Sequence, residues 1–161
     1  MIIRPYNTGD HDEVIGLFFN TVHTVNAADY TDAQLAAWAP DPDSMRTDDE
    51  LDVKLLNGTT IVAEARGVII GFGTLTGADV FDLLYIHSAY QRLGAATLIA
   101  EEIEQAARLN GAQIITTDAS ITAKPFFENR GYRVVKKQSV PLRGQTLTNY
   151  MMEKPLFLPI E

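Results

Sequence analysis

The residues best suited to chemistry lie in a short loop, Gln91 to Ala96, between an apolar segment and a long amphipathic one. Small residues open the amphipathic segment. The first N–H groups of a helix lack intrahelical partners and carry the positive end of the helix dipole. Gly94 and Ala96 let a ligand approach that backbone, because a larger side chain would hold the ligand away. The loop therefore predicts a site for a phosphate or pyrophosphate.

Asp82 is a second candidate, because it interrupts the apolar stretch Val80 to Ile86. A carboxylate among apolar side chains is costly to bury without a partner. One interpretation is a general base carried on a strand. The other is a carboxylate at a strand start that is solvated or bonded to the backbone. The residues alone leave both interpretations open.

Composition excludes several classes of chemistry. The 161 residues contain no cysteine and three scattered histidines, which argues against thiol catalysis and a metal centre. No apolar run spans a bilayer and no signal peptide opens the chain, so we expect a cytoplasmic protein without a membrane partner. The net charge of −8 argues against nucleic acid. It favours a cationic substrate such as an amine, although the same charge would serve solubility alone.

The N-terminal third is predicted to hold one strand and three helices. The strand covers 1–5. The helices cover 8–23 with Thr8 as N-cap, 34–38 ending before Pro40, and 48–56 closed by Asn57-Gly58, while 41–44 forms a turn.

The remainder is predicted to be a sheet with two helices. The strands cover 60–65, 68–76, 78–86, 113–117, 132–140 and 145–154, and the helices lie within 88–110 and 123–129. The strand–helix–strand unit from 78 to 117 makes two strands parallel neighbours inside a mostly antiparallel sheet. The length suits a single domain of mixed α/β (α+β) class over 1–161.

Two segments resemble the GNAT superfamily of acetyl-CoA-dependent N-acetyltransferases. Gln91, Gly94 and Ala96 match its acyl-CoA signature, Gln/Arg-x-x-Gly-x-Gly/Ala, and Ser120 to Tyr132 resembles its helix beside the pantetheine arm. The resemblance covers nearly the whole chain. Within the superfamily, the sequence is most similar to an uncharacterised bacterial branch. The resemblance implies helices on both faces of a mixed, mostly antiparallel sheet, with one parallel strand pair splayed around acyl-CoA.

The resemblance also implies a set of residues at acetyl-CoA. The N–H groups of 92–96 would hold the pyrophosphate, and the backbone of Leu84 and Ile86 would bond the pantetheine amide. The expected cofactor residues are Leu84, Tyr85, Ile86, Gln91, Arg92, Leu93, Gly94, Ala95, Ala96, Thr97, Ser120, Ala123, Phe126 and Phe127. Ser120 has an alternative role as a helix N-cap. Lys124 and Arg130 either meet the 3′-phosphate or are ordinary solvated charges.

The chain departs from the family at the general acid. Many members carry Tyr at the position of Phe127, where the hydroxyl protonates the sulfur of CoA. Another hydroxyl, on Tyr85, Tyr132 or Tyr150, would have to replace it, or water would protonate a thiolate whose ordinary pKa is near 8.5. Asp82 is the expected base. The substrate candidates are His23, Asp29, Tyr30, Trp38 and Asn149, which could equally form a packing cluster.

Two functions follow. The first is transfer of acetyl from acetyl-CoA to a primary amine of a small molecule or peptide, by direct attack and with no covalent enzyme intermediate. The second is a non-catalytic acyl-CoA-binding or regulatory module, which the departure at Phe127 keeps open. A third hypothesis, a structural or scaffold protein, does not explain the predicted phosphate-binding loop from Gln91 to Ala96. Analogy with the family makes a homodimer a further expectation.

Overall fold

The computed structural model describes residues 1–46 and 49–157, and the strands within them form one sheet in the order β1-β2-β3-β4-β5-β7-β6. Every neighbouring pair is antiparallel except β4 and β5. The strands are β1 (Ile2–Pro5), β2 (Thr59–Ala65), β3 (Val68–Thr76), β4 (Val80–Ile86), β5 (Ile114–Ser120), β6 (Arg133–Leu142) and β7 (Gln145–Pro155). The predicted mixed sheet with one parallel pair is confirmed.

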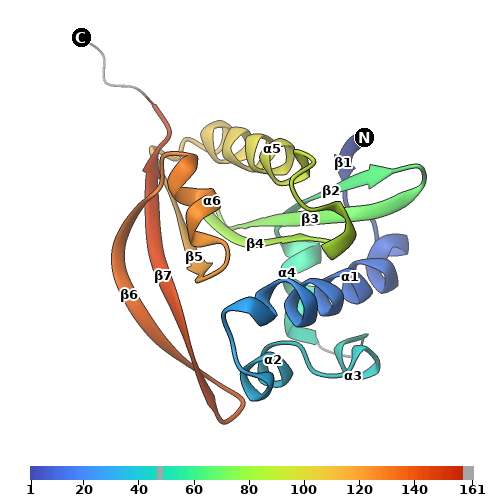
Figure 1. The fold of residues 1–161 in the computed structure, drawn as a ribbon. Coiled ribbons are helices and arrows are strands. Elements are labelled where there is room, and N and C mark those ends of the chain that lie inside the picture. The colour runs from blue at the N-terminus through green and yellow to red at the C-terminus, as the bar shows by residue number, and fades with distance from the viewer. Residues whose placement is uncertain (47–48, 158–161) are drawn as a thin grey trace.

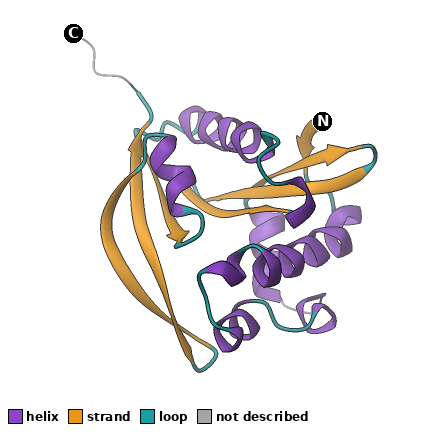
Figure 2. Ribbon diagram, viewed as in Figure 1, coloured by secondary structure: helices purple, strands orange, loops and turns teal. Residues whose placement is uncertain are grey.

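Helices cover both faces of this sheet (Figure 1, Figure 2), as predicted. The helices are α1 (His11–Thr24), α2 (Asp32–Trp38), α3 (Pro42–Arg46), α4 (Asp49–Asn57), α5 (Ala95–Leu109) and α6 (Lys124–Asn129), with short 3-10 helices at Thr8–Asp10, Asn26–Ala28 and Ser88–Tyr90. One buried core joins α1 and α2 to β2, β3 and β4, and a second joins α5 and α6 to the opposite face. Apolar residues of α5 at helical spacing, Ile99 and Ile103, are fully buried in the second core.

The parallel strands β4 and β5 separate soon after they meet. Their register contains a single pair, Val80↔Thr116. One residue further on, the Thr117 hydroxyl donates to the Phe81 carbonyl at 2.8 Å. Beyond that point β4 continues to Ile86 beside β3, while β5 continues to Ser120 beside β7. The sheet therefore opens along the C-terminal ends of both strands, and α5 starts beside the opening.

Close packing on β3 brings α5 onto the middle of the sheet. A Cβ added at Gly73 would lie 2.7 Å from Cγ2 of Ile99 on α5, a distance that real Cβ atoms essentially never show. A glycine is needed here so that helix and strand can approach. The contact fixes the body of α5 and, with it, the position of the loop that precedes the helix.

Three local predictions need correction. The turn expected over 41–44 is wrong, because α3 begins at Pro42, and proline suits the first helical position. Thr8 is not the N-cap: it opens a 3-10 helix whose N-cap is Asn7, and the Asn7 N–H donates to the Asp10 carboxylate at 2.9 Å. The strand expected over 113–117 runs on to Ser120, because β7 keeps pairing with it. The helix expected over 48–56 is α4, with residue 48 outside the described residues.

Candidate functional site

A large cavity of about 620 Å³ fills the opening between β4 and β5. Its lining comes mainly from β4, the loop before α5, the start of α5, the end of β5 and α6, and the N-terminal helical region adds Thr21, Val25, Asn26 and Trp38. It includes every residue predicted to meet the cofactor except Leu93, whose side chain is 61% exposed and lies outside the lining. The fold thus gathers residues from two segments about 30 positions apart in the chain.

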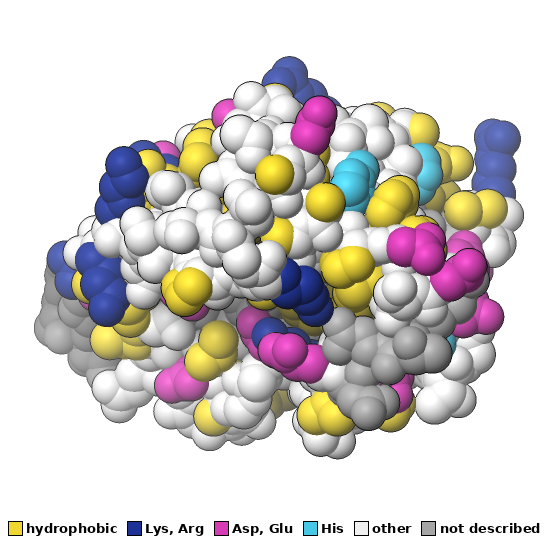
Figure 3. All heavy atoms as spheres, turned by 90° about the horizontal axis from the view of Figure 1, so that it is seen from below, with side chains coloured by type: hydrophobic (Ala, Val, Ile, Leu, Met, Phe, Trp, Pro, Cys, Tyr) yellow, Lys and Arg dark blue, Asp and Glu magenta, His cyan; other side chains and the backbone are white. Residues whose placement is uncertain are grey.

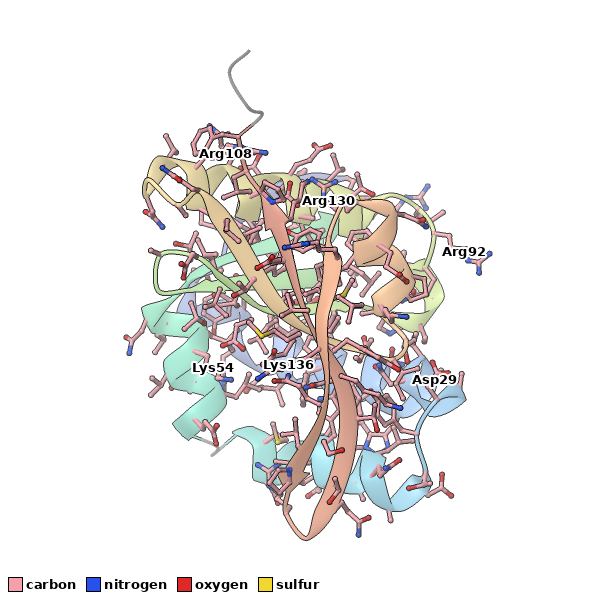
Figure 4. The ribbon with its side chains drawn as sticks, turned by 90° about the vertical axis from the view of Figure 1, so that its left-hand side faces the viewer. Asp29, Lys54, Arg92, Arg108, Arg130 and Lys136 are labelled. Carbon is pink, nitrogen blue, oxygen red and sulfur yellow. The ribbon has the colours of Figure 1, made fainter. Side chains whose placement is uncertain are left out.

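The loop before α5 has the backbone geometry of an anion site. Arg92 and Gly94 both adopt positive φ, 61° and 90°, and Gly94 is the N-cap of α5. The Gly94 carbonyl accepts the first α5 bond, from the Leu98 N–H at 3.1 Å, so the preceding N–H groups are free to face a ligand. Alternating left-handed residues turn successive N–H groups into one concavity. The Arg92 side chain is exposed and projects from this end of the molecule (Figure 4).

Gln91 holds the loop against β4. Its side-chain amide donates to the Ile86 carbonyl at 2.7 Å and approaches the His87 carbonyl at 3.4 Å. The Thr21 hydroxyl donates to the same Ile86 carbonyl at 2.8 Å. Gln91 lines the large cavity, but these bonds give its side chain a positioning role, which sequence reasoning did not foresee.

The backbone of β4 offers hydrogen-bonding groups to the cavity. The His87 N–H donates to the Ile70 carbonyl of β3 at 2.8 Å. Because bonded pairs alternate along antiparallel strands, the Tyr85 backbone faces β3, whereas those of Leu84 and Ile86 face the opening. The Ile86 carbonyl is already occupied by Gln91 and Thr21. The Leu84 backbone is therefore the group on this edge best placed to pair with an extended ligand.

A wall of aromatic rings closes the large cavity on the α6 side. Phe127 is only 3% exposed and meets Phe81, Phe126 and Tyr132 edge to face, with ring centroids 5.0–5.4 Å apart. At the end of β5, the Ser120 hydroxyl accepts from the Ala123 N–H at 3.0 Å, which helps to start α6. The N-cap of α6 is Ala123, so the predicted N-cap role of Ser120 is wrong; Ser120 bonds the N-cap residue and also lines the cavity.

A smaller cavity of about 300 Å³ lies on the side of the sheet that carries α1 to α4, next to the β6–β7 hairpin. On the face seen from below, acidic, basic and hydrophobic side chains meet near the middle of the surface (Figure 3). The two cavities share six lining residues: Trp38, Asp82, Leu83, Tyr85, Asp118 and Ser120. The shared residues mark a junction where the contents of the two cavities can meet.

Asp82 lies at this junction and has two polar partners. The Thr76 hydroxyl donates to its Oδ2 at 2.8 Å, and the Lys54 Nζ lies 3.3 Å from the same oxygen. The Asp82 side chain keeps 23% of its surface exposed. Its partners are two side chains rather than the backbone, and the carboxylate also lines both cavities, so its role as a base stays a prediction.

Tyr85 lies at the junction too, and its hydroxyl accepts a hydrogen bond from the Trp38 indole N–H at 3.2 Å. Burial raises the pKa of the Tyr85 phenol well above its ordinary value, so the hydroxyl keeps its proton at neutral pH. With the phenol oxygen accepting from Trp38, its own proton is available to a group in the cavity.

The other two candidate tyrosines lie outside both cavity linings. The Tyr132 hydroxyl donates to the buried carboxylate of Glu104 at 2.9 Å, and burial together with Glu104 raises the pKa of that phenol. The Tyr150 ring packs under the Lys124 ammonium, which lies 4.9 Å from the ring centroid. Arg130 is neither a solvated charge nor a cleft residue, because it too binds Glu104. The structure does not bring these residues to the junction.

The predicted substrate residues divide into two groups. Tyr30, Trp38 and Asn149 line the small cavity. His23 instead bonds the Ala39 carbonyl at 2.7 Å, and Asp29 accepts from the Thr122 hydroxyl at 2.7 Å, both outside the lining. The Tyr30 hydroxyl is fully used, because it donates to the Thr148 carbonyl and accepts from the Ile121 N–H.

Asp118 is the residue at the junction that sequence reasoning missed. It is exposed, lines both cavities and stands on β5 two residues before Ser120. The strand had been expected to end at Thr117, which placed Asp118 in a loop.

Within the described part of the chain, no group of His, Asp and Glu gathers as metal ligands. Over the same residues, no helix is long and apolar enough to cross a bilayer.

Comparisons with known proteins agree with this geometry. A family model described as an acetyltransferase (GNAT) domain matches residues 26–154. The uncharacterized N-acetyltransferase YafP of Escherichia coli (strain K12) is 32% identical over 154 residues, which cover 95% of each chain.

Two solved structures are similar in fold. A GCN5-related N-acetyltransferase (aminotransferase, class-II) from Rhodopseudomonas palustris is 31% identical and superposes with a TM-score of 0.90, covering 96% of this chain and 94% of its own. The PaiA N-acetyltransferase of Thermoplasma acidophilum, in complex with coenzyme A, is 15% identical with a TM-score of 0.74, covering 96% and 98%.

Proposed function

The chain belongs to the GNAT family of acetyl-CoA-dependent N-acetyltransferases, and we propose that it moves the acetyl group to a primary amine of a small molecule by direct attack. Acetyl-CoA is its co-substrate. The observation that carries the proposal is the junction between the two cavities. The large cavity suits an extended thioester, and the small cavity suits its acceptor.

The residues of the large cavity fit acetyl-CoA. The N–H groups of 92–96 would bind the pyrophosphate, since the positive φ at Arg92 and Gly94 makes the loop concave. The Leu84 backbone would pair with a pantetheine amide as an added strand. A volume of about 620 Å³ lies within the range of ligand sites. The bound co-substrate supplies an acetyl thioester, which this arrangement would direct toward the junction.

Asp82 would take the proton that the amine must lose, directly or through a water. In the transfer, the amine nitrogen bonds to the acetyl carbon as the carbon–sulfur bond breaks, and CoA leaves as a thiolate. No covalent bond to the protein is needed, in agreement with a chain that has no cysteine. Asp82 suits this role because Thr76 and Lys54 fix its carboxylate at the junction.

Tyr85 would stabilise the negative charge that develops on the thioester, and water would protonate the thiolate. The pKa of Tyr85 is raised above an ordinary phenol, whereas a thiol has an ordinary pKa near 8.5. A phenol with a raised pKa does not readily transfer its proton to a thiolate, but it can still donate a hydrogen bond to the thioester oxygen. This assignment accounts for a chain with Phe127 where many relatives carry Tyr.

Replacing Tyr85 by Phe is expected to lower kcat about 10-fold, while KM for acetyl-CoA stays within about twofold. The ring packing against Phe18 and Phe72 survives the change, because only the hydroxyl is lost. Steady-state kinetics at saturating amine measures the effect. Tyr150→Phe is the matched control, and an equal loss in both variants would count against Tyr85.

Thermal unfolding with added acetyl-CoA tests the cofactor site. At about 100 times Kd the ligand adds roughly 2.7 kcal/mol of stability, which raises Tm by roughly 5–10 °C. CoA should act similarly and ATP should not. Gly94→Ala should greatly reduce the shift, because a Cβ there enters the anion loop and disfavours φ of 90°.

Gly77→Ala is the matched control, since Gly77 also has positive φ, with open space around an added Cβ, but lies outside both cavity linings. Its shift with acetyl-CoA should equal that of the unchanged protein. Equal increases in Tm with acetyl-CoA in the two glycine variants would show that the loop from 92 to 96 does not bind acetyl-CoA. Binding without acetylation of any amine would instead favour an acyl-CoA-binding module and contradict the proposed transfer.

A further inference from the structure

Asp118 is the carboxylate at the junction that has no cationic partner. Its Oδ1 accepts a hydrogen bond from the Gln138 amide at 3.1 Å. Among the residues that the structure describes, it takes part in no ion pair. Strand alternation puts Lys136 on the same face of β6 as Gln138, and Met151 of β7 separates it from Asp118 across the sheet, but no ion pair joins these two described side chains. Asp118 therefore presents an uncompensated negative charge to the cavity.

The charges around the small cavity single out Asp118. Among the residues that the structure describes, three carboxylates line the cavity, on Glu50, Asp82 and Asp118, together with two cationic side chains, Lys54 and Arg143. Asp82 is already compensated by Lys54 at 3.3 Å. Over the described part of the lining, the carboxylates outnumber the cations by one, which suits one ammonium group better than several.

The rest of the small cavity is largely apolar. Tyr30 and Trp38 meet edge to face with centroids 5.2 Å apart, and Phe18 meets Tyr85 in the same way at 4.8 Å. The aliphatic lining residues are Met45, Leu51, Leu83, Val140, Leu142 and Leu147. A volume of about 300 Å³ is at the small end for ligand sites. These side chains favour binding of a compact apolar group, because the group is removed from water when it binds in the cavity.

We propose that Asp118 binds the ammonium group of the acceptor, and that the acceptor is a compact monoamine whose apolar body fills the small cavity. This inference rests on the proposed acetyl transfer and adds the acceptor class to it. Asp118 binds the amine and Asp82 takes its proton, so the two carboxylates have separate roles. An α-carboxylate on the acceptor would lie beside Asp118 and be repelled, and a second ammonium would meet Lys54 or Arg143.

Steady-state kinetics with three probes tests the acceptor class: 2-phenylethylamine, L-phenylalanine and spermidine. We expect kcat/KM for 2-phenylethylamine to exceed that for each of the others at least 10-fold. Asp118→Asn should raise KM for 2-phenylethylamine about 10–100-fold and change kcat less than threefold, because a charge-assisted hydrogen bond is lost on binding. Asp118→Glu should recover part of the loss.

Asp79→Asn is the matched control: it removes the same charge from an exposed residue outside both linings, and its KM should not change. The acetyl-CoA thermal shift of each variant reports whether fold and cofactor site are intact. An unchanged KM in D118N, or a preference for spermidine or L-phenylalanine, overturns the inference and leaves the acetyl transfer standing. Acetyl-CoA binding with no turnover of any amine overturns both.

Discussion

Replacing Glu104 by Gln is expected to lower the free energy of unfolding by about 3–5 kcal/mol, and hence Tm by roughly 6–20 °C. Glu104 is 1% exposed and lies between α5 and the sheet. Arg130 donates to both of its oxygens, at 2.8 and 2.9 Å, and Lys154 and Tyr132 each donate at 2.9 Å. The amide keeps the shape but leaves two partly buried cations, Arg130 and Lys154, without a counter-charge.

A second ion pair provides the matched control. Arg133 and Glu153 lie only 2.6 Å apart, but the Arg133 side chain is 78% exposed. Exposed pairs contribute little, since water solvates both charges when they separate. Glu153→Gln should therefore lower the free energy of unfolding by less than about 1 kcal/mol. Urea unfolding of both variants measures the contrast, and equal losses would show that burial does not decide the effect.

Acid pH should weaken the folded state through the same carboxylate. Burial alone would raise the pKa of Glu104, but the bonds from Arg130 and Lys154 outweigh it and hold the pKa below its ordinary value. The unfolded chain therefore binds the proton first as pH falls, so stability is full above the ordinary carboxyl pKa and lost below it. Asp10, whose pKa is lowered by Arg4, acts in the same direction. The urea midpoint of Glu104→Gln should depend less on pH below about 5.

The Glu104 cluster also shows where sequence reasoning reaches its limit. The strand–helix–strand pattern predicts the parallel pair, because local periodicity and chain connectivity dictate it, and the resemblance to the family adds the opening beside α5. The partners of Glu104 come from the loop between α6 and β6 and from β7, and no periodicity relates those positions. Arg130 was thus predicted to be a solvated or cofactor-binding charge, and Tyr132 was one of three candidate general acids.

The same limit explains the site. The concave backbone of the loop before α5 could be predicted because its residues are contiguous, and its role as an anion site stays a prediction. Asp118 was missed because its position at the cavity depends on the pairing of β5 with β7 as far as Ser120, and these strands are distant in the sequence. Asp29 and His23 were chosen by residue type, but partners elsewhere in the chain, the Thr122 hydroxyl and the Ala39 carbonyl, use their polar groups. The type of a residue indicates which chemistry it could perform, but tertiary packing determines whether its side chain faces the cavity.

Replacing Asp82 by Asn is expected to lower kcat about 10²–10⁴-fold at pH 7 and to leave the acetyl-CoA thermal shift unchanged. The amide can still accept the Thr76 hydrogen bond, so position is kept while the ability to take a proton is lost. Thr76→Val is the companion variant: it keeps the carboxylate but loosens it, and should cost about 10-fold or less. Initial rates with 2-phenylethylamine measure both.

The pH profile distinguishes a base from a residue that only shapes the junction. Below an alkylamine pKa near 10, the free-amine fraction rises about tenfold per pH unit, so the deficit of D82N should shrink steadily between pH 7 and 9. A purely structural defect would persist at every pH. Turnover within about threefold of the unchanged protein at pH 7 would remove Asp82 from the mechanism. Because loss of Asp118 should alter KM and loss of Asp82 kcat, the two carboxylates can be assigned independently.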